Sequence, residues 1–215
     1  MTENSVPDGE RESRIVLKNF SQAADNNKNA ILSVLKRYFL EPGVLLEIGS
    51  GSGQHAIHMA EQLPLIAWQP TEMSTNLAAL EENLLIGGKT NVLEPAELEI
   101  GVVWPGGEYR YAYAANVLHI MPARLLPDLF SGLSARMSLG GLLFFYGPFK
   151  YAGEFTTESN ARFDGWLKRS YREAGIRDVE TVEDEAASAG FKLVDDLSMP
   201  ANNQLLVLVT DDDLT

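Results

Sequence analysis

The strongest local signal in this 215-residue chain is the stretch Leu46-Glu47-Ile48-Gly49-Ser50-Gly51-Ser52-Gly53. A short apolar run over 44–48 leads into it, and a helical pattern over 54–63 follows. Glycine lets such a turn adopt positive φ and leaves no Cβ in the way of a ligand. The free N–H groups of the following helix face the same space. The stretch therefore predicts a strand, a glycine-rich turn and a helix that bind a nucleotide-like ligand.

Two carboxylates accompany this turn. Glu47 stands before the first glycine, and Glu72 comes 19 residues after Gly53, at the expected end of the second strand. One helix and one strand fill that interval, so Glu72 is expected beside the turn in space. A carboxylate there can accept both hydroxyls of a ribose. The glycine spacing is G-x-G-x-G and not G-x-G-x-x-G, which disfavours a nicotinamide-dependent oxidoreductase.

Strand and helix patterns alternate on both sides of the turn. Strands are expected over 44–48, 65–69, 92–100, 109–115 and 142–146, the last led in by Gly140-Gly141. Helices are expected over 26–40, 54–63, 74–86 and 125–137. Two more helices, 160–173 and 182–189, precede two final strands, 191–197 and 204–209. Strands separated by helices predict a parallel, doubly wound α/β sheet.

Composition excludes several classes of protein. There is no cysteine, which removes disulfide frameworks, thiolate zinc sites, iron–sulfur clusters and cysteine nucleophiles. Only three histidines are present, His55, His58 and His119, and no metal site is expected. The 30 acidic residues against 17 basic ones give a net charge of −13, which disfavours a nucleic-acid partner. No apolar run approaches the roughly 18 residues of a membrane span, and the polar start lacks a signal-peptide core, so a cytoplasmic protein is expected.

The chain is expected to form one domain. We place it at residues 21–210, after a flexible N-terminal arm at 1–20 and before an acidic C-terminal tail at 211–215. No feature of the sequence indicates a homo-oligomer, although none excludes one.

Two levels of resemblance follow from these motifs. E-x-G-x-G-x-G after the first strand resembles motif I of the class I S-adenosylmethionine-dependent methyltransferases. From about Ser21 to Val209, the chain further resembles the DUF938 or methyltransferase-like-26 family. The segments that carry this second resemblance are 27–32 (NKNAIL), 47–55 (EIGSGSGQH), 68–72 (WQPTE), 116–120 (NVLHI), 146–150 (YGPFK) and 199–203 (MPANN).

The resemblance implies a Rossmann-like, doubly wound, seven-stranded and mostly parallel sheet with an antiparallel final strand and helices on both faces. It also implies S-adenosyl-L-methionine as cofactor. Glu72 would then hold the ribose, Met73 would lie near the adenine, and Glu99 would meet the adenine amino group, with Glu94 and Glu97 as near-equivalent candidates. The residues expected around the methionine part are Glu47, Gly49, Ser50, Gly51 and Gly53. His55, beside the turn, is a further candidate for cofactor contact.

Candidate catalytic residues follow the fourth and fifth strands, because ligands of open α/β sheets bind at the carboxyl ends of the strands. His119 is the candidate general base, since its unperturbed pKa lies near neutrality. Asn116 is expected near the transferring methyl and the cofactor, and Tyr146 is expected to orient an acceptor. The alternative for His119 is a histidine that faces a helix and is hydrogen-bonded to the backbone, and the alternative for Tyr146 is packing. The set also includes Phe149 and Trp166, which are expected to form an aromatic wall. Asn202 and Asn203 are further candidates for pocket residues.

These observations favour a methyltransferase that acts on a small molecule. Asn116 is not followed by Pro-Pro and an aromatic residue, so the amino-methylation signature of DNA-type enzymes is missing. A protein that binds S-adenosylmethionine without catalysis is the main alternative, because both predict the same cofactor residues. A nicotinamide-dependent oxidoreductase is the weaker one.

Overall fold

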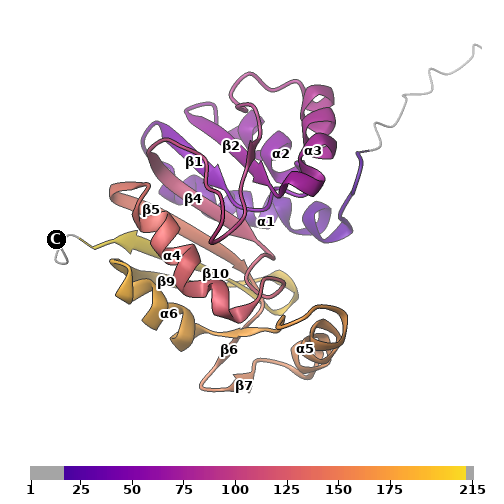
Figure 1. Ribbon diagram of the computed structural model, residues 1–215, viewed down its shortest axis with the longest axis vertical. Coiled ribbons are helices and arrows are strands. Elements are labelled where there is room, and N and C mark those ends of the chain that lie inside the picture. Colours follow the sequence, from indigo (N-terminus) through magenta and orange to yellow (C-terminus); the bar gives the residue numbers. More distant parts are fainter. Residues whose placement is uncertain (1–16, 212–215) are drawn as a thin grey trace, which may run out of the picture.

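The computed structural model describes residues 17–211. Most of the expected arm and residues 212–215 of the expected tail therefore lie outside the described residues. Seven strands form one sheet in the order β3-β2-β1-β4-β5-β10-β9, and β10 runs antiparallel to both of its neighbours (Figure 1). This confirms the predicted mostly parallel sheet with an antiparallel final strand. The strands are β1 Gly43–Glu47, β2 Ile66–Glu72, β3 Ala96–Glu97, β4 Tyr109–Ala115, β5 Met137–Gly147, β9 Phe191–Met199 and β10 Asn203–Thr210.

Helices cover both faces of the sheet because side chains alternate along each strand. In β1, Leu45 faces the core shared with α1 (Gln22–Tyr38) and α2 (Gln54–Gln62). Leu46 faces the opposite core, shared with α4 (Leu126–Ser134) and α6 (Val179–Ser188). The helix α3 (Ser74–Gly87) lies beside α2 (Figure 1). The strands are thus buried on both faces, as a parallel sheet requires.

Helix α1 begins at Gln22, four residues before the start at residue 26 that the apolar periodicity predicts. Ser21 is the N-cap, and its hydroxyl accepts a hydrogen bond from the N–H of Ala24 at 3.2 Å. The first turn of α1, Gln22 to Asp25, has no large apolar side chain, so hydrophobic periodicity alone cannot reveal it.

Strand β5 also begins earlier than expected, at Met137 and not at 142. Gly140 has a φ of 70°, and the register between β4 and β5 shifts between Tyr109 and Tyr111. The glycine pair at 140–141 therefore forms an irregularity inside the strand, where a loop was expected. The preceding helix correspondingly ends at Ser134 and not at 137.

Between β5 and α6 the chain forms an additional unit, residues 148–178, here called the cap. It holds α5 (Glu158–Ser170) and a three-stranded sheet of β6 (Phe149–Tyr151), β7 (Glu154–Phe155) and β8 (Arg177–Asp178). The cap lies at one end of the molecule, beyond the carboxyl end of β5 (Figure 1).

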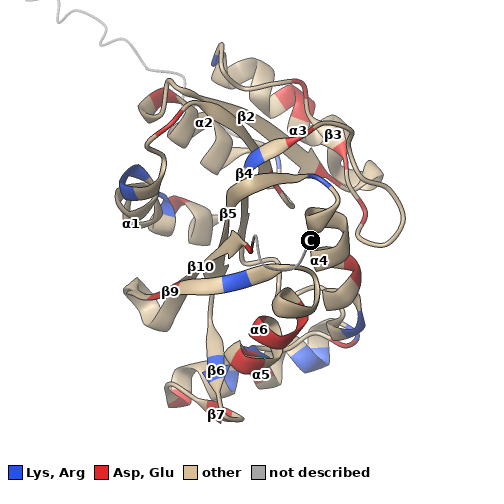
Figure 2. Ribbon diagram, turned by 90° about the vertical axis from the view of Figure 1, so that its left-hand side faces the viewer, with Lys and Arg blue, Asp and Glu red and all other residues tan. Residues whose placement is uncertain are grey.

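Charge is distributed unevenly over this fold. Acidic residues lie along α6, whereas basic residues lie on α1 and α5 (Figure 2). Two short 3₁₀ helices, Ala123–Leu125 and Pro200–Asn202, complete the described elements. None of the helices in the described part of the chain is long and apolar enough to cross a membrane.

Candidate functional site

A cavity of about 710 Å³ opens at the carboxyl ends of β1, β2, β3 and β4. This volume falls within the usual range for small-molecule sites, roughly 300 to 1,000 Å³. Its lining comes from five segments that are distant in sequence. They are the start of α1 (Asn19, Ser21, Ala24), the glycine turn with His55, the end of β2 with Asn76, the segment after β3 (Leu98, Glu99, Ile100), and the segment after β4 (Ala115, Asn116, Val117, Ile120, Met121, Pro122, Arg124, Leu125).

The three turn glycines have positive φ but different surroundings. Gly49 and Gly51, at 69° and 57°, line the cavity, and a Cβ on Gly51 would meet nothing within 4 Å. Gly53, at 76°, is not among the lining residues. A Cβ there would lie 2.9 Å from Cδ2 of Leu84 and 3.0 Å from Cδ1 of Leu80. Gly53 therefore allows α2 to pack closely against α3, whereas Gly51 leaves room for a ligand.

Glu72 lies at the end of β2 and lines the cavity, as the spacing predicted. Its Oε2 accepts the N–H of Gly51 at 2.9 Å, and its Oε1 accepts the N–H of Met73 at 3.0 Å. Each carboxylate oxygen can accept more than one hydrogen bond, so both can still receive ligand hydroxyls. Met73 itself lines the cavity.

Of the three glutamates considered for the adenine, Glu99 alone lines the cavity. It follows β3 and its side chain is exposed. Glu97 lies within β3 and Glu94 precedes it, and neither is a lining residue. The structure therefore favours Glu99 among the three.

Glu47 lies beneath the turn and is not among the lining residues. Its Oε2 accepts hydrogen bonds from the hydroxyl of Ser50 at 2.7 Å and from Nε1 of Trp68 at 2.9 Å. Burial raises the pKa of Glu47 to about 7, although these two hydrogen bonds oppose the rise. The buried carboxyl group thus holds the glycine turn in place through its hydrogen bond with Ser50.

His55 lines the cavity from the start of α2. Its Nε2 lies 2.8 Å from Oδ1 of Asn27, and its Nδ1 lies 3.2 Å from the hydroxyl of Tyr113. Burial lowers the pKa of His55 to about 4, so the ring is neutral at pH 7. The amide oxygen of Asn27 can only accept, so the proton lies on Nε2 and Nδ1 accepts from Tyr113.

On the side of the cavity nearest β5, only one of the three candidate catalytic residues is a lining residue. Asn116 lines the cavity with a φ of 61°, and its N–H donates to the carbonyl of Tyr146 at 2.8 Å. His119 and Tyr146 are buried behind it, each 5% exposed. Burial, aided by the charge of Arg177, lowers the pKa of His119 to about 4.

Tyr146 is held by the first residue of β10. Its hydroxyl accepts a hydrogen bond from Nδ2 of Asn203 at 3.0 Å. The carbonyl of Asn202 accepts from Nδ2 of Asn160, on α5, at 3.0 Å. These two asparagines therefore brace Tyr146 and the cap, and neither is a lining residue. Phe149 is buried, and Trp166 is 47% exposed on α5.

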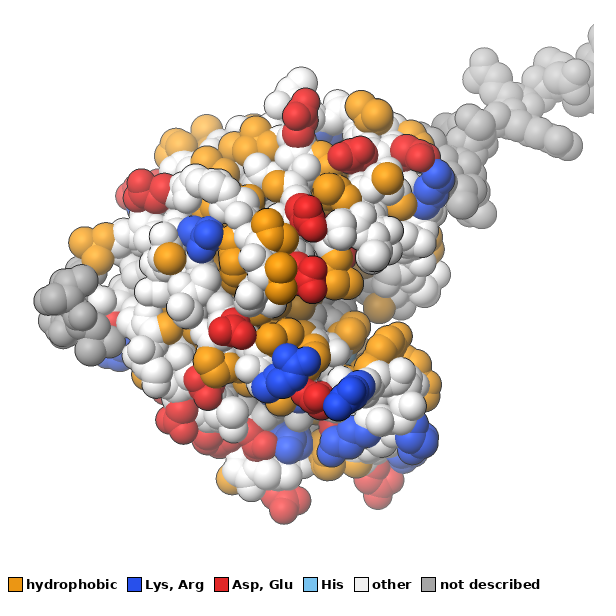
Figure 3. Space-filling view, viewed as in Figure 1, with side chains coloured by type: hydrophobic (Ala, Val, Ile, Leu, Met, Phe, Trp, Pro, Cys, Tyr) orange, Lys and Arg blue, Asp and Glu red, His pale blue; other side chains and the backbone are white. Residues whose placement is uncertain are grey.

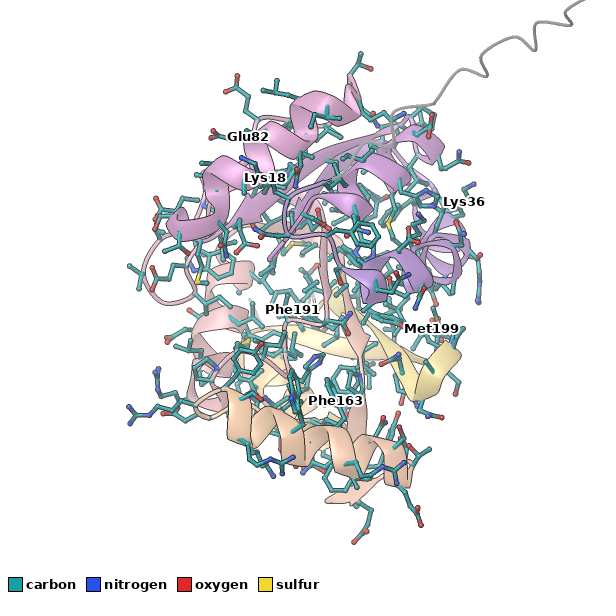
Figure 4. The ribbon with its side chains drawn as sticks, turned by 90° about the vertical axis from the view of Figure 1, so that its right-hand side faces the viewer. Lys18, Lys36, Glu82, Phe163, Phe191 and Met199 are labelled. Atoms are coloured by element: carbon teal, nitrogen blue, oxygen red, sulfur yellow. The ribbon has the colours of Figure 1, made fainter. Side chains whose placement is uncertain are left out.

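The sequence did not reveal the contribution of the segment before α1. The N–H of Lys18 donates to Oδ1 of Asn83 and its carbonyl accepts from Nδ2, both at 2.9 Å. Lys18 also pairs with Glu82 (Figure 4). Lys18 thus contacts α3, while Asn19 and Phe20 remain exposed, and the flexible arm at 1–20 stays a prediction. Ser21 as a helix cap was the one signal that could have found this.

No group of side chains among residues 17–211 has the composition and spacing to hold a metal ion. The lining of the cavity itself carries two carboxylates, Glu72 and Glu99, and one guanidinium, Arg124.

Residues 18–209 match the family described as "Protein of unknown function (DUF938)". The chain belongs to the DUF938 family. The match covers the sheet, both layers of helices and the cap, so the cavity lies entirely within the DUF938 region.

Solved structures similar to this DUF938 chain include several methyltransferases. A family 2 O-methyltransferase from Planctomyces limnophilus DSM 3776, in complex with apigenin, is 19% identical with a TM-score of 0.69 and covers 80% of this chain. An O-methyltransferase from Nostoc punctiforme PCC 73102 is 18% identical with a TM-score of 0.76 and covers 86%. PigF with SAH is 20% identical with a TM-score of 0.73 and covers 86%.

The DUF938 chain spans about half the length of these proteins, 52%, 56% and 55% respectively. At these identities the likeness establishes the fold, which is that of the class I methyltransferases.

Proposed function

We propose that this chain is an S-adenosylmethionine-dependent methyltransferase for a small-molecule acceptor, within the methyltransferase-like-26 group of DUF938. The observation that carries the proposal is the cavity at the carboxyl ends of the strands. It joins the open glycine turn to Glu72 on β2 and to Glu99 after β3. A site at this edge is where open α/β sheets bind nucleotide-like ligands.

The residues present fit this cofactor. Gly51 leaves open space above its backbone, and Glu72 retains acceptor capacity for two ribose hydroxyls. Glu99 is the acceptor for the adenine amino group, with Met73 beside the ring. The carboxylates also suit a cationic ligand. When bound, the cofactor supplies a methyl carbon attached to a positively charged sulfur.

The remaining predicted contacts extend this assignment. We assign Gly49, Ser50, Gly51 and His55 to the methionine part of the cofactor, and Asn116 to the neighbourhood of the methyl group. Glu47 and Gly53 act through the shape of the turn, because neither lines the cavity.

One of the similar structures supports a small-molecule acceptor, because the Planctomyces protein was determined with apigenin. PigF was determined with SAH, which supports the cofactor. In this chain His119 is the general base and Tyr146 orients the acceptor. Methyl transfer needs an in-line approach in a dry site, so positioning by these groups can supply much of the rate.

A second candidate is a protein that binds the cofactor without catalysis. The observation in its favour is that His119 and Tyr146 lie behind Asn116 and not in the cavity lining. An oxidoreductase that binds a nicotinamide dinucleotide is the third candidate, and the glycine spacing argues against it.

Thermal melting with three ligands tests the proposal. S-adenosylmethionine, S-adenosylhomocysteine and NAD would be added separately to the full chain. A ligand at 100 times its dissociation constant stabilises by about 2.7 kcal/mol, which is a clear shift in melting temperature. We expect stabilisation by the two adenosyl compounds only. Stabilisation by NAD alone, or by none of the three, would overturn the proposal. Methyl transfer to an acceptor then separates the enzyme from the non-catalytic binder.

A further inference from the structure

We infer that the methyl acceptor is a planar aromatic molecule with a hydroxyl group, which lies against Phe163 and directs that hydroxyl to His119. The inference rests on the proposed function and names the substrate class of the same site. Three observations carry it: a convergence of polar groups at the end of β5, a ladder of aromatic rings along α5, and the charges around both.

The polar groups converge on Gly147, the last residue of β5. A Cβ placed on Gly147 would lie 3.3 Å from Nδ1 of His119 and 3.9 Å from Oδ1 of Asn116. Gly147 does not have positive φ, so its backbone conformation does not require glycine. Its lack of a side chain instead lets an imidazole and an amide approach one point, next to the part of the cavity that Asn116 lines.

Among the described residues, no side-chain hydrogen bond of the His119 ring is found, and neither ring nitrogen is one of the fully buried atoms without a partner, which are Nε2 of His58 and Nε of Arg110. The ring contact of His119 is with Phe163, edge to face, with centroids 5.4 Å apart. A buried histidine that serves only packing is normally hydrogen-bonded, as His55 is here. The ring of His119 therefore keeps a lone pair for a group that comes from outside the chain.

Aromatic rings lead from His119 to solvent along the cap. Phe163 points from α5 toward the sheet (Figure 4). It stacks on Trp166 with centroids 5.7 Å apart and planes 13° apart, and Trp166 meets Tyr171 edge to face at 5.9 Å. Trp166 and Tyr171 are nonetheless 47% and 45% exposed. Stacked rings that remain half exposed offer flat faces to another ring.

Charge around this ladder disfavours a cationic acceptor. Arg177 is buried behind the segment after β4, and its guanidinium donates to the carbonyls of Leu118 and Met121. Arg124 lines the cavity. Basic side chains gather over the α5 end of the molecule in Figure 3. A hydroxyl that becomes negative as it reacts is favoured beside these groups, whereas an ammonium group is not.

The nearby carboxylates are already engaged. Asp164 accepts from the N–H of Ile176 at 2.8 Å and pairs with Lys168 at 2.7 Å. Glu173 pairs with Arg124 at 3.0 Å and with Arg172 at 3.5 Å. Asp164 and Glu173 are therefore engaged, and the carboxylates that line the cavity, Glu72 and Glu99, are assigned to the cofactor.

The chemistry balances for such an acceptor. The hydroxyl oxygen supplies the electron pair of a new O–C bond to the methyl carbon of the sulfonium donor. The S–C bond breaks with its electrons remaining on sulfur, which becomes a neutral thioether. The hydroxyl proton passes to the unprotonated ring nitrogen of His119 and then to water.

Calorimetry on the full chain saturated with S-adenosylhomocysteine tests the inference without requiring turnover. The probes are 2-naphthol, decahydro-2-naphthol, which keeps the hydroxyl and lacks the aromatic rings, and 2-naphthylmethylamine, which keeps the rings and carries a cation. We expect 2-naphthol to bind at least about tenfold more tightly than either, because decahydro-2-naphthol loses the ring contacts and 2-naphthylmethylamine brings a cation close to buried Arg177.

Two variants locate the binding. Trp166→Ala removes an exposed ring with little cost to folding and should weaken 2-naphthol binding about fivefold. Phe163→Leu keeps an apolar side chain at the half-buried position and should weaken it similarly. Leu139→Ala is the matched control: Leu139 is 70% exposed at the other end of β5, and its loss should leave the affinity unchanged.

Failure of this inference differs from failure of the proposed function. If S-adenosylhomocysteine does not bind, the proposed function fails. If it binds, but 2-naphthol binds no better than the other two probes or is unaffected by both aromatic variants, the acceptor class is wrong.

Discussion

The backbone N–H of Gly51 donates to Oε2 of Glu72 at 2.9 Å, which joins the glycine turn to the end of β2. The two residues are 21 positions apart and belong to different strand–helix units. This bond fixes the carboxylate at the edge of the cavity, with its second oxygen held by the N–H of Met73. Two backbone hydrogen bonds therefore hold the Glu72 carboxylate at the rim of the site without a ligand.

Replacement of this carboxylate should separate binding from folding. Glu72→Ala removes the acceptor for the ribose hydroxyls, so we expect the affinity for S-adenosylhomocysteine to fall at least about tenfold, while loss of the two internal hydrogen bonds costs about 1–3 kcal/mol of stability. Calorimetry and urea melts measure the two effects. Glu97→Ala is the control, since Glu97 is exposed in β3 outside the cavity. Equal affinities in the two variants would refute the ribose role.

A pair of glycines with nearly the same φ tests the turn. Gly51 and Gly88 have φ of 57° and 58°, and a Cβ on either would meet nothing within 4 Å. Alanine should cost each about 1–2 kcal/mol of stability, because left-handed backbone disfavours a side chain. Only Gly51→Ala places a methyl group in the cavity, so only this variant should lose affinity for S-adenosylmethionine. Loss in both, or in neither, would mean that the turn is not the binding surface.

Gly53→Ala should behave differently from Gly51→Ala. Its Cβ would lie 2.9 Å from a methyl group of Leu84 in addition to having positive φ. We expect a loss of about 2–4 kcal/mol in the free energy of unfolding, larger than for Gly51→Ala. Urea melts of the two variants side by side decide this, and equal losses would contradict the packing role.

The general base can be examined apart from cofactor binding. His119→Gln keeps polarity and size but cannot take a proton, so we expect methyl transfer to 2-naphthol to slow about a hundredfold. Because His119 lies outside the cavity lining, the affinity for S-adenosylhomocysteine should change less than about twofold. An unchanged transfer rate would leave His119 with a packing role only.

The same side chain makes stability depend on pH. Burial lowers the pKa of His119 from 6.5 to about 4, so between these values the unfolded chain binds a proton that the folded chain does not. The free energy of unfolding therefore falls as the pH falls from 6.5 toward 4, by at most about 3 kcal/mol for this group. His119→Gln should lose less stability than the parent between pH 7 and pH 5 in urea melts. Parallel losses would show that His119 titrates normally.

The turn and its carboxylates were predictable because neighbouring elements fix them. The strand, the turn and the helix around Gly51 are consecutive, and Glu72 follows after one more helix and strand, so its place depends only on regular geometry. The resemblance pointed to Glu99, but spacing alone left Glu94 and Glu97 as near-equivalent candidates, and which of them lines the cavity was not predictable. It depends on where a two-residue strand, β3, pairs with β2, and two residues show no periodicity.

The cap and the start of α1 were hidden for related reasons. The strands β6, β7 and β8 have three, two and two residues, too few for alternation to appear. Lys18 and Asn83 are in contact although they are 65 residues apart in the sequence. An asparagine such as Asn83 is equally common on the exposed face of a helix, so nothing in the sequence indicated this contact. The burial of His119 depends on Phe163 and Arg177, which come from the cap, so the sequence could not decide between its catalytic and packing roles.

The attachment of Lys18 to Asn83 has a practical consequence for work on this protein. Asn19 and Ser21, immediately after it, line the cavity, so the amino-terminal segment enters the fold at the rim of the site. Strand β10 begins opposite Gly147 and runs to the other edge of the sheet, where the N–H of Asp211 donates to the carbonyl of Gly190. Shortening the chain past Lys18 would therefore remove the contact with Asn83 and part of the cavity lining together, so a variant made for ligand-binding work should retain these residues.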